Sequence, residues 1–419
     1  MSNVPPKADS PQTADLRHAD LIYDWNVVRD FEPPARGIEF DDETLRDGLQ
    51  SPSVTDPPIE RKIEILHLMA AVGIQSVNVG LPGAGPRAVR DVTRLVEEIR
   101  DQRLPLQPNC AARTHDNDIL PVAEISQRTG VAIETATFIG SSPIRQYAED
   151  WTLERMLEHT IHASKLCQKH QLPQMYVTED TTRAHPNTLR QLYLAAIEHG
   201  ARRIVVCDTV GHATPLGVRN LIRFIRELVA ESGEDVKIDW HGHRDRGLDL
   251  SNALAAIDAG AHRIHGTALG VGERCGNAAL DLLLVNLKLL GAITNDLTRL
   301  PDYVRAVSES LRVPIPRNYP VFGTDAFETA TGVHAAAVIK AFKKKDVWLA
   351  NRVYSGVPAD EFGLEQKISI GPMSGRSNVI FWLEKRGLRA DEALVTKIFD
   401  RAKQSDRLLT DAELNALVK

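Results

Sequence analysis

The sequence predicts a closed (β/α)8 barrel followed by a smaller, mainly helical C-terminal region. Two observations support this fold class. From residue 36 onward one unit repeats eight times: a short β-rich run, a polar or glycine-rich turn and a longer amphipathic stretch. Polar residues also gather directly after the short runs, where such a barrel builds its reaction site. Strand alternating with helix implies a parallel sheet, and eight units imply closure.

The eight short runs have the length and the β-branched content of buried strands. They are GIEFDD (37–42), IQSVNVGL (74–81), LQPNCAA (106–112), AIETATFIG (132–140), QMYVTEDT (174–181), RIVVCDTV (203–210), KIDWHGH (237–243) and RIHGTALG (263–270). An open, doubly wound sheet is the structural alternative. No GxGxxG motif follows the first run, which argues against that alternative.

The stretches between these runs have helical periodicity, as in RKIEILHLMAAVG (61–73) and TPLGVRNLIRFIRELVA (214–230). The second stretch begins with Thr214 as N-cap and Pro215 in the first helical position, a strong start signal. Its apolar residues then recur at helical spacing, at Leu221, Ile222, Ile225 and Leu228.

Composition excludes several classes of protein. The 419 residues carry a net charge of −6, which gives no reason to expect nucleic acid or an anionic membrane as a partner. No run approaches the roughly 18 consecutive apolar residues of a membrane span. The four cysteines stand far apart without a CxxC pair, so we expect a reduced, cytoplasmic compartment.

We expect three parts along the chain: a polar N-terminal tail (1–35), the catalytic barrel (36–295) and C-terminal subdomains (296–419). The last part would supply a linker and lid or dimerisation elements. We expect no separate regulatory domain that binds an amino acid.

A pair of histidines predicts a metal site. His241 and His243 lie two residues apart at the end of the seventh run, so strand periodicity directs both imidazoles to one face. Asp47 follows the first run and offers a carboxylate, and Asn277 follows the eighth run and offers an amide oxygen. Three or four protein ligands leave positions open for a substrate, as a catalytic ion requires. An HxH pair by itself also occurs on surfaces and in cores.

Five motifs in order carry a family resemblance: DETLRDGLQ (42–50), TEDTTR, CDTVGHATP, HGHRDRGLDLSN and GVGERCGN. They resemble the 2-isopropylmalate, homocitrate and citramalate synthases, which share a metal-dependent TIM-barrel superfamily with the HMG-CoA lyases. The likeness covers about residues 36–385. TGVHAAAVIKA (331–341) and GPMSGRSNV (371–379) resemble the synthases' C-terminal region, which the lyases lack, so condensation of acetyl-CoA with a 2-oxo acid is favoured over cleavage.

The resemblance implies the metal ligands Asp47, His241 and His243, with Asn277 close to the ion. Mg²⁺, Mn²⁺ and Zn²⁺ all suit such a site. Arg46 would stabilise negative charge on the enolate or on the former keto oxygen.

The resemblance also implies residues that contact the substrates. Gln50 and Thr209 would contact the 2-oxo acid. Glu179 and His334 would support proton transfers, and Tyr354 would assist. The synthases' downstream region commonly closes over the barrel of a partner, which implies a homodimer with His334 acting in trans.

Plainer interpretations stand beside these roles. Arg46 can pair with Asp47 as a structural ion pair, and Glu179 can cap the following helix, as we expect Asp180 to do. His334 can be a packing histidine, and Tyr354 a strand or core residue. His212, His262 and His265 receive no role.

Several residues depart from the common synthase pattern: Leu49, Asn78 in place of a glutamate, Arg145 in place of a histidine, and Arg244. We expect Leu49, Asn78 and Arg145 near the side chain of the 2-oxo acid. A cationic Arg145 or Arg244 would favour a dicarboxylic acid such as 2-oxoglutarate. A carbon–carbon lyase and a catalytically silent barrel scaffold remain the alternatives to a synthase.

Overall fold

The computed structural model describes residues 18, 21–22, 26 and 37–419. Apart from those four early residues, the expected tail (1–35) lies outside the described residues. The chain forms two compact units, divided between Gly323 and Thr324. The first unit holds the barrel, and the second holds residues 324–419 together with the described residues near the N-terminus.

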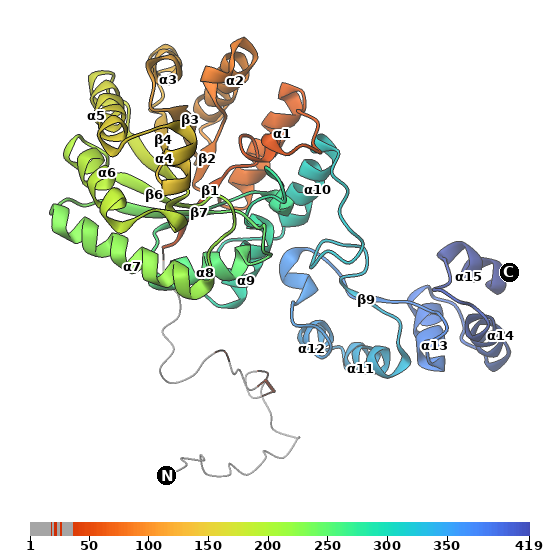
Figure 1. Cartoon of the computed structure of the whole chain (residues 1–419). Helices are drawn as coiled ribbons and strands as arrows, with labels where there is room; N and C mark the ends of the chain where they lie inside the picture. The colour runs from red at the N-terminus through yellow and green to blue at the C-terminus, as the bar shows by residue number, and fades with distance from the viewer. Residues whose placement is uncertain (1–17, 19–20, 23–25, 27–36) are drawn as a thin grey trace, which may run out of the picture. The chain divides into compact units, whose positions relative to one another are not determined.

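Eight parallel strands close into a barrel in sequence order, and β1 pairs with both β2 and β8 (Figure 1). This closure confirms the predicted fold class and excludes the open sheet. The strands are β1 (Glu39–Asp42), β2 (Ser76–Asn78), β3 (Gln107–Arg113), β4 (Glu134–Gly140), β5 (Gln174–Glu179), β6 (Arg203–Asp208), β7 (Lys237–Gly242) and β8 (Arg263–Gly266).

Helices between the strands surround the barrel (Figure 1). Helix α7 begins as expected, because the Thr214 side chain accepts a hydrogen bond from the Gly217 amide and Pro215 is the first helical residue. The helices are α1 (Ile59–Ala71), α2 (Pro86–Asp101), α3 (Asp116–Thr129), α4 (Pro143–Glu149), α5 (Leu153–Lys169), α6 (Pro186–Glu198), α7 (Pro215–Ser232), α8 (Asp249–Ala259), α9 (Leu280–Leu289) and α10 (Leu300–Leu311).

Charged side chains occupy part of the barrel interior, where branched apolar residues are common. Asp239 on β7 accepts hydrogen bonds from Arg203 on β6 and from Arg263 on β8, both at 2.7 Å. Arg263 also donates to Glu134 on β4 at 2.7 Å. The strand register places Asp41 beside His265 and places His265 beside His241. The barrel therefore brings ionisable groups from distant segments into adjacent positions.

Helix α10 belongs with the barrel unit. The buried Tyr303 hydroxyl donates to the Asp42 carboxylate at the end of β1, and it lies 3.2 Å from the Thr44 hydroxyl. The expected boundary at 295/296 lies before this helix, whereas the two compact units divide after Gly323.

The second unit is mainly helical, as predicted. A short parallel pair, β9 (Glu328–Thr329) and β10 (Lys367–Ile368), accompanies five helices. Its apolar core includes Ile370, Val379, Trp382 and Ile398. The helices are α11 (Gly332–Lys343), α12 (Val347–Arg352), α13 (Arg376–Lys385), α14 (Glu392–Lys403) and α15 (Asp411–Val418).

Two further features bear on the expectations from composition. Within the described part of the chain, no helix combines the length and the apolar character needed to cross a membrane. All four cysteines are free thiols, and only Cys275 is exposed.

Candidate active site

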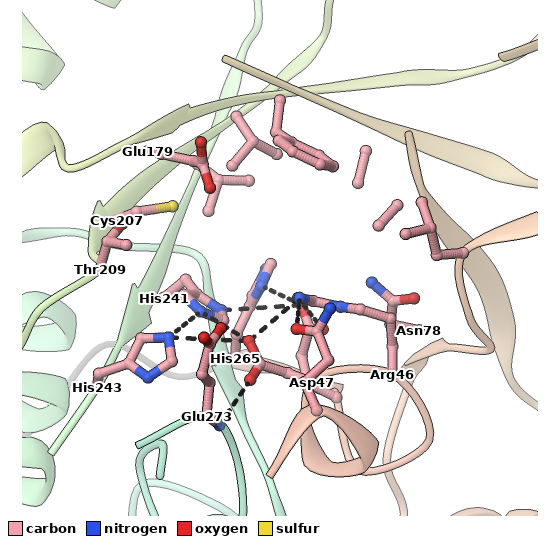
Figure 2. A pocket seen from close by; sticks show the side chains of 18 of the residues that line it. Arg46, Asp47, Asn78, Glu179, Cys207, Thr209, His241, His243, His265 and Glu273 are labelled. Atoms are coloured by element: carbon pink, nitrogen blue, oxygen red, sulfur yellow. Dashed lines mark hydrogen bonds and ion pairs between the residues drawn. The ribbon is translucent and has the colours of Figure 1, made fainter. Parts of the chain in front are cut away.

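A cavity of about 290 Å³ lies at the carboxyl ends of the barrel strands (Figure 2). One group of lining residues is polar or charged: Glu43, Arg46, Asp47, Gln50, Asn78, Glu179, Thr209, His241, His243, His265, Glu273 and Arg274. A second group is apolar or a neutral thiol: Leu81, Ala111, Ala136, Phe138, Met175, Val177, Val205 and Cys207. Burial raises the pKa of the Cys207 thiol well above its ordinary value, so this residue is no nucleophile near neutral pH.

The three residues expected to bind a metal converge in this cavity. Asp47 Oδ2 lies 3.5 Å from His241 Nε2 and 3.8 Å from His243 Nε2, and the two Nε2 atoms are 3.4 Å apart. Ligand atoms that share one ion at about 2.1 Å are separated by about 3 to 3.5 Å. The three side chains are buried and need only small shifts to share an ion.

Asn277 lies beside this group. Its backbone pairs with that of His243, and its buried Oδ1 atom has no hydrogen-bond partner in the structure. An added Cβ at Gly272 would lie 2.1 Å from Asn277 Nδ2 and 3.2 Å from Asp47 Oδ1. Residue 272 must therefore be glycine for the loop to lie this close to Asn277 and Asp47. The unpaired Oδ1 of Asn277 is an acceptor of the type that a hard cation binds.

The protonation states suit a cation. Burial lowers the pKa of His241 to about 3 and also lowers the pKa of His243, so both imidazoles are neutral near pH 7. Burial would raise the pKa of Asp47, but the adjacent Arg46 guanidinium holds it below its ordinary value. Neutral imidazoles and an ionised carboxylate are the forms that coordinate metals.

Arg46 lines the cavity and is held by carboxylates on two sides. Its Nη2 pairs with Glu43, and its Nη1 lies 3.1 Å from Asp47 Oδ2 and 3.4 Å from Gln50 Oε1. The structural ion pair considered from the sequence is present. The guanidinium nevertheless borders the open cavity, so the ion pairs fix a positive charge where a substrate would bind.

Glu179 and Thr209 also line the cavity (Figure 2). Burial raises the pKa of Glu179, although Arg145 and Arg46 oppose the rise. Arg145 Nη2 lies 3.5 Å from Glu179 Oε2. The Thr209 hydroxyl accepts a hydrogen bond from the Asp180 amide at 2.8 Å and keeps its own hydrogen to donate.

Asp180 does not cap the following helix, contrary to expectation. It has a left-handed φ of 59°, and its carboxylate makes no capping hydrogen bond. It instead accepts hydrogen bonds from Arg183, at 2.7 and 2.8 Å, and from the Ser142 hydroxyl. Charged and hydroxyl donors therefore occupy both oxygens of this carboxylate.

The structure separates the residues that depart from the synthase pattern. Asn78 lines the cavity, whereas Leu49, Arg145 and Arg244 do not. Arg145 reaches it only through Glu179. Arg244 Nη1 lies 3.4 Å from the Leu269 carbonyl, beneath the loop after β8.

Among the polar or charged lining residues, four received no role from the sequence: Glu43, His265, Glu273 and Arg274. Glu43 follows β1 within the DETLRDG motif, and His265 alternates with the inward-facing Arg263 on β8. Strand periodicity was therefore a usable signal for His265. Glu273 and Arg274 lie in an irregular loop, where no periodicity indicates direction. His212 and His262 do not line this cavity.

His334 and Tyr354 belong to the second unit. Their rings stack with centroids 4.0 Å apart, and Tyr354 is half exposed. Tyr354 is therefore not a core residue, and the two side chains expected to act together are neighbours. Their part in the reaction stays a prediction.

The closed barrel and the carboxylate–histidine cavity define a TIM-barrel class of enzyme with a candidate metal site, and a family comparison places the chain in a known family. The HMGL-like family matches residues 37–307. The chain belongs to this family.

Particular relatives match nearly the whole chain. A homocitrate synthase, AksA, of Methanopyrus kandleri is 33% identical over 403 residues, covering 95% of each protein. A 2-isopropylmalate synthase of Pyrococcus furiosus is 31% identical, covering 92% of this chain and 76% of that protein. Among solved structures, a Bacillus subtilis HMG-CoA lyase superposes with a TM-score of 0.57 at 20% identity, covering 68% of this chain and 97% of the lyase. That likeness shows the barrel fold.

Proposed function

We propose that this protein is a divalent-metal acyltransferase that condenses acetyl-CoA, or a related acyl-CoA, with a 2-oxo acid and releases CoA. The observation that carries the proposal is the convergence of Asp47, His241 and His243 beside Arg46 in one cavity. Relatives named homocitrate, 2-isopropylmalate and citramalate synthase support this reaction class.

In this reaction a base removes a proton from the acetyl methyl group, and that carbon forms a bond to C2 of the 2-oxo acid. The keto oxygen takes up a proton to become a hydroxyl, and water then cleaves the thioester to release CoA. A bound Mg²⁺, Mn²⁺ or Zn²⁺ held by Asp47, His241 and His243, with Asn277 beside it, would polarise the keto carbonyl.

The chain's own residues supply the remaining functions. Arg46, held by Glu43 and Asp47, stabilises the developing oxyanion without reorganising. Glu179 takes up the methyl proton, because its raised pKa brings its basicity closer to neutral pH. Gln50 and Thr209 hydrogen-bond to the 2-oxo acid.

The apolar wall favours a 2-oxo acid with an apolar side chain, such as 2-oxoisovalerate. Phe138, Met175, Val177 and Val205 offer no partner for a second carboxylate. Burying a charge against such a surface is costly. The second candidate is 2-oxoglutarate. The cationic Arg145, which lies beside Glu179, favours this dicarboxylic acid, and one relative is named as a homocitrate synthase. Pyruvate, the substrate of a citramalate synthase, would fill less of the cavity.

A carbon–carbon lyase is the alternative reaction. The synthase relatives align with most of residues 324–419, whereas the lyase structure covers 68% of the chain. This extent favours the synthase. We further propose a homodimer in which His334, assisted by Tyr354, acts in trans during thioester hydrolysis. The support is the resemblance of residues 331–341 to the synthases.

The test is release of free CoA thiol from acetyl-CoA, screened with 2-oxoisovalerate, pyruvate, 2-oxoglutarate and longer 2-oxo acids. We expect release with one preferred acid, largest for 2-oxoisovalerate. A chelator should abolish release, and added Mg²⁺, Mn²⁺ or Zn²⁺ should restore it.

No release from folded, metal-loaded protein with any acceptor or acyl-CoA would overturn the synthase. Cleavage of a 3-hydroxyacyl-CoA by the same preparation would then identify the lyase. A matched Asp47→Asn variant tests the alternative of a catalytically silent barrel. An activity that depends on the metal ligand should be lost in this variant, and an activity that the variant keeps does not come from this site.

A further inference from the structure

Glu43 is a buried carboxylate in the cavity, and its only part in the proposed chemistry is to hold Arg46. It is 2% exposed and lies directly after β1. Three potential donors surround it: Arg46 Nη2, which pairs with Oε2, and His265 Nδ1 and His241 Nδ1, which lie 3.2 and 3.8 Å from Oε1. A carboxylate this deeply buried requires such partners, because an isolated buried charge is strongly destabilising.

The surroundings of His265 determine where its hydrogens lie. Its Nε2 is 3.0 Å from Asp239 Oδ2, and its Nδ1 is 3.2 Å from Glu43 Oε1 and 3.6 Å from Asp41 Oδ2. Ionised carboxylates only accept hydrogen bonds, so both ring nitrogens must donate. His265 therefore donates to Glu43 from one ring nitrogen and to Asp239 from the other.

Glu43 in turn determines the tautomer of His241. The Nδ1 atom of His241 lies 3.8 Å from Glu43 Oε1, beyond hydrogen-bond distance, so the negative charge of the carboxylate favours the tautomer with its hydrogen on Nδ1 through electrostatic attraction. The lone pair is left on Nε2, which lies 3.5 Å from Asp47 Oδ2 and 3.4 Å from His243 Nε2. A histidine that ligates a metal commonly donates its other N–H to a carboxylate, which fixes the ring and strengthens the ligand.

The same residues suggest a different interpretation. Glu43, His241 and His265 lie close enough together to hold an ion of their own. Both nitrogens of His265 face carboxylates, however, so neither has a free lone pair. A second ion would require His265 to give up one of these hydrogen bonds. The geometry favours an ordering contact over a second metal site.

We propose that Asp239, His265 and Glu43 form a buried relay that positions His241 Nε2 and the Arg46 guanidinium for the metal and the substrate. Glu43 is a positioning residue in this relay, not a metal ligand. The inference rests on the metal site of the proposed function and adds residues that the metal-ligand motif does not include.

The first test measures which ring nitrogens of His241 and His265 carry hydrogen, in wild-type protein labelled with ¹⁵N at its 14 histidines. Two-bond ¹⁵N–¹H spectra distinguish the nitrogens, and His241→Gln and His265→Gln variants assign the signals. In metal-free protein at pH 7.5 we expect both nitrogens of His265 to be protonated and His241 to carry its hydrogen on Nδ1. Zn²⁺ should then shift the Nε2 signal of His241. A His265 with one bare nitrogen, or a His241 protonated on Nε2, would overturn the relay.

The second test measures Mn²⁺ and Zn²⁺ affinity by calorimetry, so it does not depend on turnover. Glu43→Gln places an amide NH₂ against groups that are themselves donors, and we expect a 10- to 100-fold weaker affinity. Glu98→Gln is the matched control, because it removes a buried carboxylate of the barrel unit that pairs with His67 and Arg94, outside the relay. Its metal affinity should equal that of the wild type.

The outcomes separate the two proposals. Equal metal affinity in wild type and Glu43→Gln would overturn the relay and leave the proposed function standing. A wild-type protein that binds neither Mn²⁺ nor Zn²⁺ would overturn both. If Glu43→Gln does not fold, the protonation of the His241 and His265 rings in the wild type still tests the proposal.

Discussion

Burial and charge oppose each other at individual residues of the cavity, and Glu179 is the clearest case. Its carboxylate is half-buried and lies 3.5 Å from Arg145. Burial favours the neutral acid, and the arginine favours the ion. Burial prevails, so the pKa is raised above its ordinary value. The basicity of this residue therefore depends on a neighbour that does not itself line the cavity.

This balance predicts a pH dependence. A base acts in its ionised form, so kcat/KM should fall as pH falls through the raised pKa of Glu179, giving an acid limb above pH 4.5. Arg145→Gln removes the cation that lowers this pKa, so the limb should move to higher pH. Steady-state rates from pH 5 to 9 measure both midpoints, with the exposed Arg155→Gln as a control that should match the wild type.

An Arg145→Gln limb that stays in place would show that Glu179 is not the titrating base. The same variant tests the dicarboxylic substrate. Unchanged selectivity between 2-oxoisovalerate and 2-oxoglutarate would exclude Arg145 as the partner of a second carboxylate.

At the scale of elements, the loop between β8 and α9 has the least freedom. Gly272 lies against Asn277 and Asp47, and Gly276 has φ of +108° with the Gly270 carbonyl oxygen 1.8 Å from where its Cβ would be. Only glycine allows the loop to fold this closely beside the cavity.

Gly272→Ala should therefore damage the metal site. The new methyl group would displace Asn277 and crowd Asp47, and overpacking of this kind costs about 1 to 3 kcal/mol in unfolding free energy. We expect weaker Mn²⁺ binding by calorimetry and a lower midpoint in urea. Gly217→Ala in α7 is the control, since its nearest neighbour would be at an ordinary 3.6 Å. Undiminished Mn²⁺ affinity in Gly272→Ala would contradict the assigned role of Asn277 and Asp47.

At the scale of the whole molecule, the two units predict separable functions. A chain ending at Gly323 keeps the barrel, including α10 and its Tyr303–Asp42 hydrogen bond. We expect it to unfold cooperatively and to bind Mn²⁺. Its CoA release should fall at least 100-fold, because the proton transfers assigned to His334 are lost. Circular dichroism, calorimetry and the thiol assay measure the three properties.

A truncated barrel that still condenses acetyl-CoA would remove residues 324–419 from the chemistry. One that instead cleaves a 3-hydroxyacyl-CoA would favour the lyase. Loss of folding would show that the barrel depends on the second unit.

The barrel was predictable because each repeat carries its own periodicity and start signals, as Thr214 and Pro215 illustrate. The metal-ligand candidates could be predicted from the sequence for a related reason. His241 and His243 differ by one strand period, and in a closed barrel only the eighth strand lies between their strand and the first, which precedes Asp47. The direction of the Arg244 side chain could not be predicted in this way, because Arg244 lies two residues beyond the end of β7 and a loop has no fixed periodicity.

Local pattern along the chain thus determined the fold class, the position of the cavity and three converging metal-ligand candidates. Tertiary structure alone decided how the charges pair: Glu43 with Arg46 and His265, and Asp239 with two arginines. Glu43 and Arg46 are only three residues apart, but the other pairings join separate strand regions, and each pairing depends on the burial and neighbours of both partners. Periodicity predicts the face on which a side chain lies, whereas its pKa and its partner follow from everything else that reaches that face.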